Sequence, residues 1–392
     1  RAAAGITALA MCAGLGGCYS EDKAWAAKMG DTTLPIGGYI YYLTSAFAEG
    51  SGQVSPQSNV LGSEIDGKDA AQWLRDKAAD YLRSYYYVND KFDQLGLSLS
   101  EDDQSSIEST TASMWSYNKT ALESMGIAQS SFEEAYAVYN TKLSKLLKAM
   151  YGKGGELEIP EDELKEYYTG EYIYYQYFTV ELTKPGEEED QSVDMDDEEK
   201  AQVKFDLEEY VQEISSGKQT IDRAAANYAN QSGTEPNLGD PVAIKAANMS
   251  DLFKNAIEGI DNSEAVLIDA TTRCYVVQKL DVADDFKALL EDEDRYSSLL
   301  AEMKAEEFME YTIEQGKALD IQINERAINS VNVSSVAKAL GEKGTSSAES
   351  SSSSESSSSQ DDSSDSSNSS DASSSEDESS ESSSSDDASS EE

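Results

Sequence analysis

The chain has 392 residues, enough for two or three domains, and it is strongly acidic, with 76 Asp and Glu residues against 30 Lys and Arg and a net charge of −46. The positive charge that phosphate binding requires is missing, which argues against nucleic-acid binding and against attraction to a bare anionic membrane surface. Histidine is absent, and this excludes Ser-His-Asp triads, HExxH zinc sites and imidazole acid–base chemistry. No dinucleotide fingerprint, P-loop or CxxC motif is found either, so we expect no cofactor and no metal site.

The chain begins with an apolar segment that ends in a cysteine. After Arg1, an uncharged run of small and apolar residues extends to Gly17, about the length of the apolar part of a signal peptide and too short to be a convincing membrane span. The run ends in Leu-Gly-Gly-Cys at residues 15–18, which is similar to a bacterial lipobox. A buried cysteine in an ordinary apolar helix is the alternative. We expect residues 1–17 to be a signal peptide and Cys18 to carry a lipid that anchors the protein to the extracytoplasmic face of the membrane, as in Gram-positive bacteria.

The next part of the chain is predominantly helical in pattern. Residues 24–50 predict a short strand, a turn and a helix that starts near Gly37, and residues 69–97 keep apolar side chains at helical spacing. Cap-like sequences at Ser100 and Ser130 predict the starts of two further helices, with breaks at two intervening glycines. We therefore expect three or four helices with short connections.

A strand with aromatic side chains on both faces follows. Pro160 starts a short helix that leads directly into residues 171–182, EYIYYQYFTVEL. With a period of two, one face carries Tyr172, Tyr174, Gln176, Phe178, Val180 and Leu182, and the other carries Ile173, Tyr175, Tyr177, Thr179 and Glu181. Rings on both faces indicate a strand with neighbours on two sides.

The pattern after this strand is typical of an α+β protein. An acidic loop precedes a helix that ends near Ser216, and two further helices, DRAAANYAN and MSDLFKNAIEGI, are separated by a Gly/Pro/Asn-rich turn. Two strands then follow, AVLIDAT and RCYVVQKLDV, before residues 284–330 return to helix. We expect an antiparallel sheet covered by helices, and we expect the two helical parts to pack together.

Two acidic stretches carry no predicted site. Asp190–Glu199 lacks the glycine and the final glutamate spacing of an EF-hand, so a solvated loop is favoured over a calcium site. From Thr345 to Glu392 the chain is Ser with interspersed Asp and Glu, and it has too few apolar residues to offset the entropy of ordering. We predict that this tail is disordered and self-repelling, while a role in contacting cations or the cell wall, or as a phosphorylated segment, remains an alternative.

Four stretches within residues 24–330 resemble the parvulin-type foldases, in particular the lipoproteins of the PrsA group and the periplasmic chaperone SurA. The stretches are AAKMGDTTLPIGGYIYYL, LGLSLSEDDQSSIE with SMGIAQSSFEEAY, IPEDELKEYYTGEY, and NLGDP followed by MSDLFKNAIEGI. The resemblance implies a helical chaperone domain into which a parvulin-like peptidyl-prolyl isomerase (rotamase) domain is inserted. On this basis we expect the following segments: 1–17 signal peptide, 18–169 chaperone domain, 170–283 parvulin-like domain, 284–335 C-terminal helix on the chaperone domain, and 336–392 disordered tail.

The resemblance also suggests where a proline-binding site would lie, and one departure stands out. Parvulin domains place a histidine in the first strand and another in the last strand, and here those positions fall on or near Tyr177 and Tyr275. By the same resemblance the hydrophobic pocket would contain Leu238, Met249 and Phe253, and Asn230 lies near the position that often holds Cys or Asp. Ordinary core packing remains the alternative for Met249 and Phe253, and packing against a neighbouring strand remains the alternative for the two tyrosines.

Three functions remain open, and we rank them. The first is a lipid-anchored extracytoplasmic folding factor that binds unfolded, newly exported polypeptides and has weak or lost isomerase activity. The second is a working peptidyl-prolyl cis-trans isomerase without histidine, since a tyrosine hydroxyl can donate a hydrogen bond much as a neutral histidine does. The third is a surface binding or adhesion lipoprotein that reuses the scaffold. Some relatives dimerise, so the resemblance leaves a homodimer open.

Overall fold

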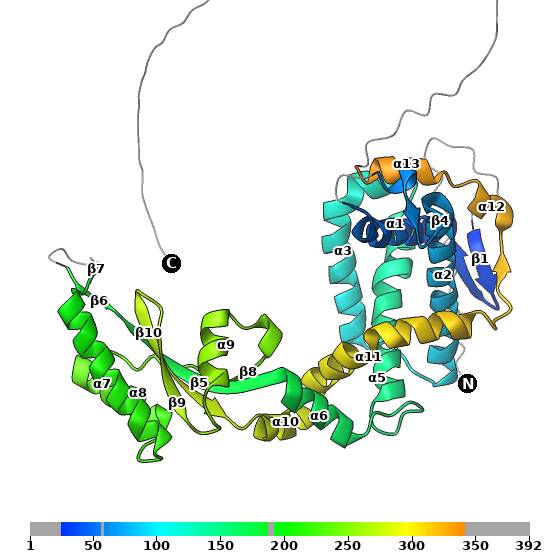
Figure 1. The fold of residues 1–392 in the computed structure, drawn as a ribbon. Coiled ribbons are helices and arrows are strands. Elements are labelled where there is room, and N and C mark those ends of the chain that lie inside the picture. The colour runs from blue at the N-terminus through cyan, green and yellow to red at the C-terminus, as the bar shows by residue number, and fades with distance from the viewer. Residues whose placement is uncertain (1–24, 56–58, 187–191, 342–392) are drawn as a thin grey trace, which may run out of the picture. The chain divides into compact units, whose positions relative to one another are not determined.

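The computed structural model describes residues 25–55, 59–186 and 192–341 of the chain (Figure 1). The predicted signal peptide, Cys18 and nearly all of the predicted tail lie outside the described residues. Within them the protein is mostly helical and contains small antiparallel sheets, which confirms the predicted α+β class. None of the described helices is both long and apolar enough to cross a membrane.

The first helical part contains the elements α1 (Ile36–Gln53), α2 (Ala70–Gln94), α3 (Glu101–Ser124), α4 (Gln129–Phe132), a π-helical segment (Glu133–Val138), α5 (Tyr139–Tyr151) and α6 (Glu161–Glu171). The breaks after α2 and α3 are at Gly96 and Gly126, which have positive φ angles of 65° and 82° that favour glycine. Ser100 and Asp103 form a capping box at the start of α3, as the sequence predicts. The next helix starts one residue before Ser130, at Gln129.

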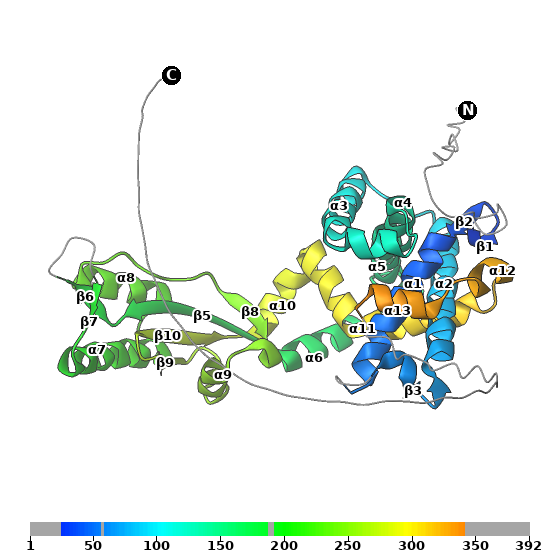
Figure 2. The same ribbon diagram turned by 90° about the horizontal axis from the view of Figure 1, so that it is seen from above.

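The returning helices pack on the first ones. They are α10 (Val282–Glu291), α11 (Glu293–Gly316), α12 (Glu325–Asn329) and α13 (Val333–Ala339). One hydrophobic core joins α11 to α2 and α5, and it includes the fully buried rings of Tyr85 and Phe308. Figure 2 shows α13 alongside α1, and the two helices are in contact. The packing of the two helical parts that the sequence suggests is therefore observed.

Short strands tie the ends of the helical part together. The strand β1 (Trp25–Met29) lies between β2 (Thr32–Pro35) and β11 (Gln322–Ile323) in an antiparallel sheet. A two-stranded ribbon of β3 (Glu64–Ile65) and β4 (Lys68–Asp69) precedes α2. Strands of two residues have no periodicity that a sequence pattern could reveal, and neither β11 nor this ribbon was predicted.

A four-stranded antiparallel sheet has the order β8–β5–β10–β9. Its strands are β5 (Tyr172–Glu181), β8 (Val242–Lys245), β9 (Ala265–Asp269) and β10 (Arg273–Leu280). β5 lies inside the sheet, with β8 on one side and β10 on the other, which confirms the prediction of neighbours on two sides. The edge strand β8 and the small hairpin of β6 (Thr183–Pro185) and β7 (Ser192–Asp194) were not predicted.

The two faces of this sheet are covered differently. On one face, α7 (Asp197–Ser215) and α8 (Ile221–Ser232) pack on Phe178, Val180 and Val276. Among the described elements, the short helix α9 (Asp251–Glu258) packs on the other face (Figure 1). The aromatic side chains of β5 and β10 lie on that face as well. The face with α9 is therefore the one that has room for a surface site.

Candidate binding site on the four-stranded sheet

The register of two strands brings Tyr177 and Tyr275 together. β5 and β10 are antiparallel, and Tyr275 lies opposite Thr179 while Val277 lies opposite Tyr177. Residues directly opposite each other in a sheet point to the same face, so both tyrosines lie on the face that α9 covers. Their ring centroids are 5.8 Å apart with the planes at 68°. The two positions that the resemblance assigns to histidines are thus neighbours in the fold.

The helix α9 adds a third ring. Phe253 makes edge-to-face contacts with both tyrosines, with its ring centroid 4.9 Å from that of Tyr275 and 6.2 Å from that of Tyr177. Met249, four residues earlier, is 9% exposed and belongs to the same core, beside Ile257. We call Tyr177, Phe253 and Tyr275 the ring cluster. Edge-to-face contact at these distances is favourable for aromatic pairs, and it fills the space between the rings.

The ring cluster faces solvent. All three side chains are partly exposed, and neither the Tyr177 nor the Tyr275 hydroxyl has a hydrogen-bond partner within residues 25–55, 59–186 and 192–341. The surface therefore presents apolar ring area together with two hydroxyl groups that can donate or accept hydrogen bonds. A ligand would lie on the rings rather than between them, and no imidazole is present to transfer a proton.

Two of the expected pocket residues lie away from the ring cluster. Leu238 lies opposite Phe178 in a β-bridge and packs on the core beneath α7 and α8, on the other face of the sheet. Asn230 is exposed on α8, the helix that covers that same face. Neither residue joins the ring cluster. The backbone beside Leu238 is attached to the same strand, because the Gly239 amide donates a hydrogen bond to the Tyr177 carbonyl oxygen over 3.0 Å.

One member of the site was not singled out from the sequence. Tyr175 stacks beside Tyr177, with ring centroids 6.0 Å apart and an interplanar angle of 28°, and it is only 8% exposed. Burial, with a smaller contribution from the Tyr177 hydroxyl, raises the pKa of Tyr175 above its usual value. The period-two pattern already placed Tyr175 and Tyr177 on one face and was the signal that could have identified it.

An exposed aliphatic side chain extends this apolar surface. Val242 on β8 lies opposite Tyr175 and therefore on the same face of the sheet, and it is 39% exposed. Leu252, next to Phe253 on α9, is 49% exposed. Val242 therefore adds apolar area beside Tyr175, whereas Leu252, at the position adjacent to Phe253 on the helix, points to a different side.

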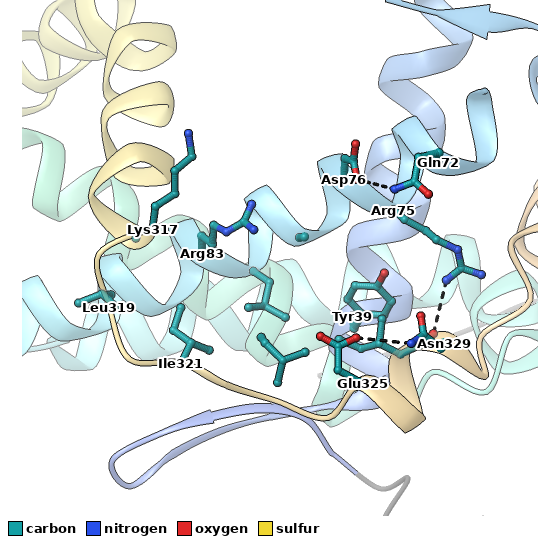
Figure 3. Close-up of a pocket in the computed structure, with 15 residues that line it drawn as sticks. Tyr39, Gln72, Arg75, Asp76, Arg83, Lys317, Leu319, Ile321, Glu325 and Asn329 are labelled. Atoms are coloured by element: carbon teal, nitrogen blue, oxygen red, sulfur yellow. Dashed lines mark hydrogen bonds between the residues drawn. The ribbon is translucent and has the colours of Figure 1, made fainter. Parts of the chain in front are cut away.

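A second concavity lies in the helical part. Its volume is about 360 Å³, and it lies between α2 and the chain segment that follows α11, with Tyr39 of α1 contributing from below (Figure 3). We call it the helical pocket. Leu82, Leu319 and Ile321 provide apolar lining, and Arg83 and Lys317 are among its charged residues.

Comparisons with known proteins gave matches only among solved structures. No protein-family model matches the chain, and no curated protein does. The foldase PrsA of Streptococcus pneumoniae is 14% identical over 71% of this chain and 97% of its own, with a TM-score of 0.31. PrsA of Bacillus subtilis is 13% identical over 65% and 90%, with a TM-score of 0.29. The foldase PrsA of Lactococcus lactis is 12% identical over 78% and 97%, with a TM-score of 0.33.

The solved structures to which this chain is similar are therefore PrsA foldases, the group that the sequence motifs resemble.

Proposed function

We propose that this protein is a lipid-anchored extracytoplasmic folding factor that binds unfolded, newly exported polypeptides and has weak or no isomerase activity. The observation that carries the proposal is the solvent-facing ring cluster of Tyr177, Phe253 and Tyr275 on a sheet face that a single short helix covers only in part. In this proposal, residues 18–169 and 284–335 form the chaperone domain and residues 170–283 form a parvulin-like binding domain.

The chemistry of the ring cluster suits weak binding to many sequences. Burying one aliphatic side chain contributes roughly 1.5–3 kcal/mol before the entropy of association is subtracted, so a single contact on the rings gives at most millimolar affinity. Rings with polar tips tolerate different partners, because every apolar side chain can lie on them. Several such contacts along one unfolded chain then raise the overall affinity.

Rapid isomerisation is not supported by the same residues. The rotation of a prolyl bond has a barrier of about 18–20 kcal/mol, and lowering it requires a held proline and a polarised amide. The rings of Tyr177, Phe253 and Tyr275 already contact one another, which leaves no open slot between them. The Tyr177 and Tyr275 hydroxyls have no hydrogen-bond partner in the described part of the chain, which favours the second candidate, an isomerase that uses tyrosine as the hydrogen-bond donor.

One pair of assays separates these candidates. The soluble chain that begins at Tyr19 would be tested for isomerase activity on a proline peptide and for suppression of aggregation of an unfolded client. We expect aggregation to be suppressed with little or no rate enhancement. A rate enhancement that Tyr177→Phe abolishes would establish the isomerase instead. No effect on aggregating clients, with one preferred ligand, would favour an adhesion lipoprotein and contradict the proposal.

A matched pair of variants locates the binding surface. Phe253→Ala removes the ring that contacts both tyrosines, and we expect it to weaken suppression of aggregation. Phe205→Ala is the control, because Phe205 is 59% exposed on α7, a helix that covers the opposite face. If both variants behave alike, or if only Phe205→Ala weakens suppression, the ring cluster is not the client site.

The lipid anchor is tested on the whole protein in a Gram-positive host. Incorporation of labelled palmitate that Cys18→Ser abolishes would support the anchor and the extracytoplasmic location. Sedimentation of the soluble chain would decide whether it forms a homodimer. A soluble protein that carries no lipid would contradict the proposed attachment but would leave client binding to be judged by the aggregation assay.

A further inference from the structure

The floor of the helical pocket is apolar and is formed by residues of the buried core. Tyr39 and Leu82 are 1% and 2% exposed, and Leu319 and Ile321 are half-buried and pack on the same core. The pocket volume of about 360 Å³ is more than twice that of an engineered cavity of about 150 Å³ that admits a benzene ring. The pocket therefore has room for one or two apolar side chains of a ligand.

The two ends of the pocket differ in their charged groups. Figure 3 shows Arg83 and Lys317 at one end, and Arg75 with Glu325 and Asn329 at the other. Arg75 donates to the Ile328 and Val331 carbonyl oxygens over 3.5 and 2.9 Å, so it is held by the C-terminal end of α12. An anionic group of a ligand would therefore be favoured at the end with Arg83 and Lys317, away from the Glu325 carboxylate.

The present partners of these two cations are weakly held. Arg83 pairs with Asp80 at 2.6 Å, and Lys317 pairs with Glu314 at 2.6 Å, in each case three residues apart on the helix surface. The side chains of Lys317 and Glu314 are 51% and 68% exposed. Exposed ion pairs such as Lys317–Glu314 contribute only about 0–1 kcal/mol. The Arg83–Asp80 pair is partly buried, with side chains 39% and 31% exposed. Lys317 can therefore turn toward a bound anion at little cost, and Arg83, whose guanidinium has five N–H donors, can bind the anion while it keeps its pair with Asp80.

Lys317 follows the C-terminal end of α11, where the negative partial charge of unpaired carbonyl oxygens would repel an anion. Here this repulsion is reduced. The carbonyl oxygens of residues 314, 315 and 316 accept hydrogen bonds from the amides of residues 317, 318 and 319. The last carbonyls of the helix are thus satisfied by the chain that leaves it. Their negative partial charge is partly offset by the Lys317 ammonium group at the same place.

The negative net charge of the chain bears on where a carboxylate can bind. With a net charge of −46, most of the surface repels a carboxylate. At physiological ionic strength such repulsion is screened beyond about 8 Å, so the nearest charges decide whether an anion binds. Arg83 and Lys317 lie at the end of the pocket away from the Asp76 and Glu325 carboxylates (Figure 3).

We propose that the helical pocket binds an apolar polypeptide segment that carries a carboxylate, with its apolar side chains on Leu319 and Ile321 and its carboxylate between Arg83 and Lys317. The inference rests on the proposed function in taking the ligand to be an unfolded client chain, and it names the class of segment that the helical part selects. The carboxylate can be the C-terminus of the client or an Asp or Glu side chain within the apolar segment, since the two groups have the same chemistry.

Fluorescence anisotropy with the complete soluble chain tests the proposal. Three N-terminally labelled peptides share one leucine-rich sequence: one has a free C-terminal carboxylate, one is amidated, and one is amidated with a Glu near its end. We expect the free carboxylate to bind about tenfold more tightly than the amide, with the difference shrinking as salt is added. Recovery of affinity by the internal Glu would show that side-chain carboxylates are accepted as well. Equal affinity of the free carboxylate and the amide would overturn the proposal.

Variants place the binding in this pocket. We expect Arg83→Gln and Lys317→Gln each to weaken the carboxylate peptide about two- to fivefold and to leave the amidated peptide unchanged. Lys287→Gln is the matched control, because Lys287 also forms an exposed pair at 2.6 Å with a residue three positions away, Asp284, but does not line the pocket. An equal loss of affinity for the carboxylate peptide in Lys287→Gln would mean that only the net charge of the protein matters, and it would overturn the assignment to the pocket.

The same preparation is tested for suppression of aggregation, which separates the two proposals. If the wild-type chain suppresses aggregation but does not distinguish the peptides, the pocket inference fails and the folding function stands. If the carboxylate peptide binds and Lys317→Gln weakens it, while no client is protected, the pocket binds its ligand and the folding function fails.

Discussion

Lys245 on the edge strand β8 forms an ion pair with Glu302 on α11, with its Nζ atom 2.8 Å from Glu302 Oε1. The hydroxyls of Tyr167 and Tyr172 each donate a hydrogen bond of 2.6 Å to the same carboxylate. Burial alone would raise the pKa of Glu302, but the hydrogen bonds from Lys245, Tyr167 and Tyr172 outweigh it, and the pKa lies below its usual value. The Glu302 carboxylate on α11 thus binds side chains from three other elements, α6, β5 and β8.

Replacing this carboxylate is expected to destabilise the protein. Glu302→Gln removes the charge that Lys245 faces and weakens both phenol hydrogen bonds, and we expect a loss of about 1 kcal/mol in the free energy of unfolding, since the site is only partly buried. Urea unfolding at pH 7 measures it. Glu306→Gln, at an exposed position on the same helix, should change the free energy little. Equal stability of the two variants would show that the cluster contributes nothing.

The close approach of α11 to α2 depends on Gly316. A Cβ atom added at this position would lie 2.5 Å from the Arg83 carbonyl oxygen, which belongs to the backbone and cannot turn away. We expect Gly316→Ala to destabilise the protein by about 1–3 kcal/mol through overpacking. Thermal unfolding measures the effect.

Gly170→Ala is the control for this variant. Gly170 lies in α6 with open space around its Cβ position, so alanine should be neutral or stabilise the helix by up to about 1 kcal/mol. If Gly316→Ala were as stable as Gly170→Ala, the close contact between α11 and α2 would not exist in solution.

The capping box of α3 predicts a pH dependence. Burial would raise the pKa of Asp103, but hydrogen bonds from Lys145 and from Ser100 outweigh it and lower the pKa to about 2. Because this folded-state pKa is below the usual value of about 3.9, the carboxylate stabilises the fold at neutral pH. The contribution is lost as the pH falls from about 4 toward 2.

Urea unfolding of Asp103→Asn measures this contribution. We expect the variant to lose about 1 kcal/mol at pH 7 and to approach the wild type near pH 2.5. Asp102→Asn, which changes an exposed carboxylate of the same turn, should show a smaller and flatter difference. A loss in Asp103→Asn that is the same at both pH values would contradict the assigned role.

The thiol of Cys274 should report unfolding. It is fully buried beneath α7 and α8, and burial, with a smaller effect of Asp269, raises its pKa above the usual value. In a chain that begins at Tyr19 it is the only cysteine. We expect a maleimide reagent to label it slowly in the native state and rapidly in urea. A cysteine introduced at the exposed Ser113 is the control, and equally rapid labelling of Cys274 in the native state would show that this face opens.

Much of the candidate site was visible in the strand at residues 171–182. Its period-two pattern separated Tyr175 and Tyr177 from Phe178 and Val180, and the structure places these pairs on opposite faces of the sheet. This pattern is local, since successive side chains of any strand alternate between faces. The motif resemblance placed Met249 and Phe253 on one helix. In the structure Phe253 lies on α9 while Met249 lies just before it, and both pack on the Tyr177 face of the sheet.

The positions of Leu238 and Asn230 could not be obtained in the same way. Leu238 follows a turn, and its face is fixed by a single bridge to Phe178 rather than by any periodicity of its own. A shift of one residue in that pairing would have moved it to the ring cluster. Asn230 lies on α8. Which face of the sheet α8 covers depends on the path of the chain between the strands, and no local pattern shows that path.

By itself, then, the sequence determined the helices, the inner strand with its two faces, the lack of imidazole chemistry and the strong negative charge, because all of these follow from composition or from patterns within about a dozen neighbouring residues. Only the tertiary structure decided that Tyr177, Phe253 and Tyr275 meet, that Lys245 reaches Glu302, and that Arg83 and Lys317 lie at one pocket. Those contacts join residues from 22 to more than 200 positions apart, and they depend on strand register and helix packing, which no local pattern contains.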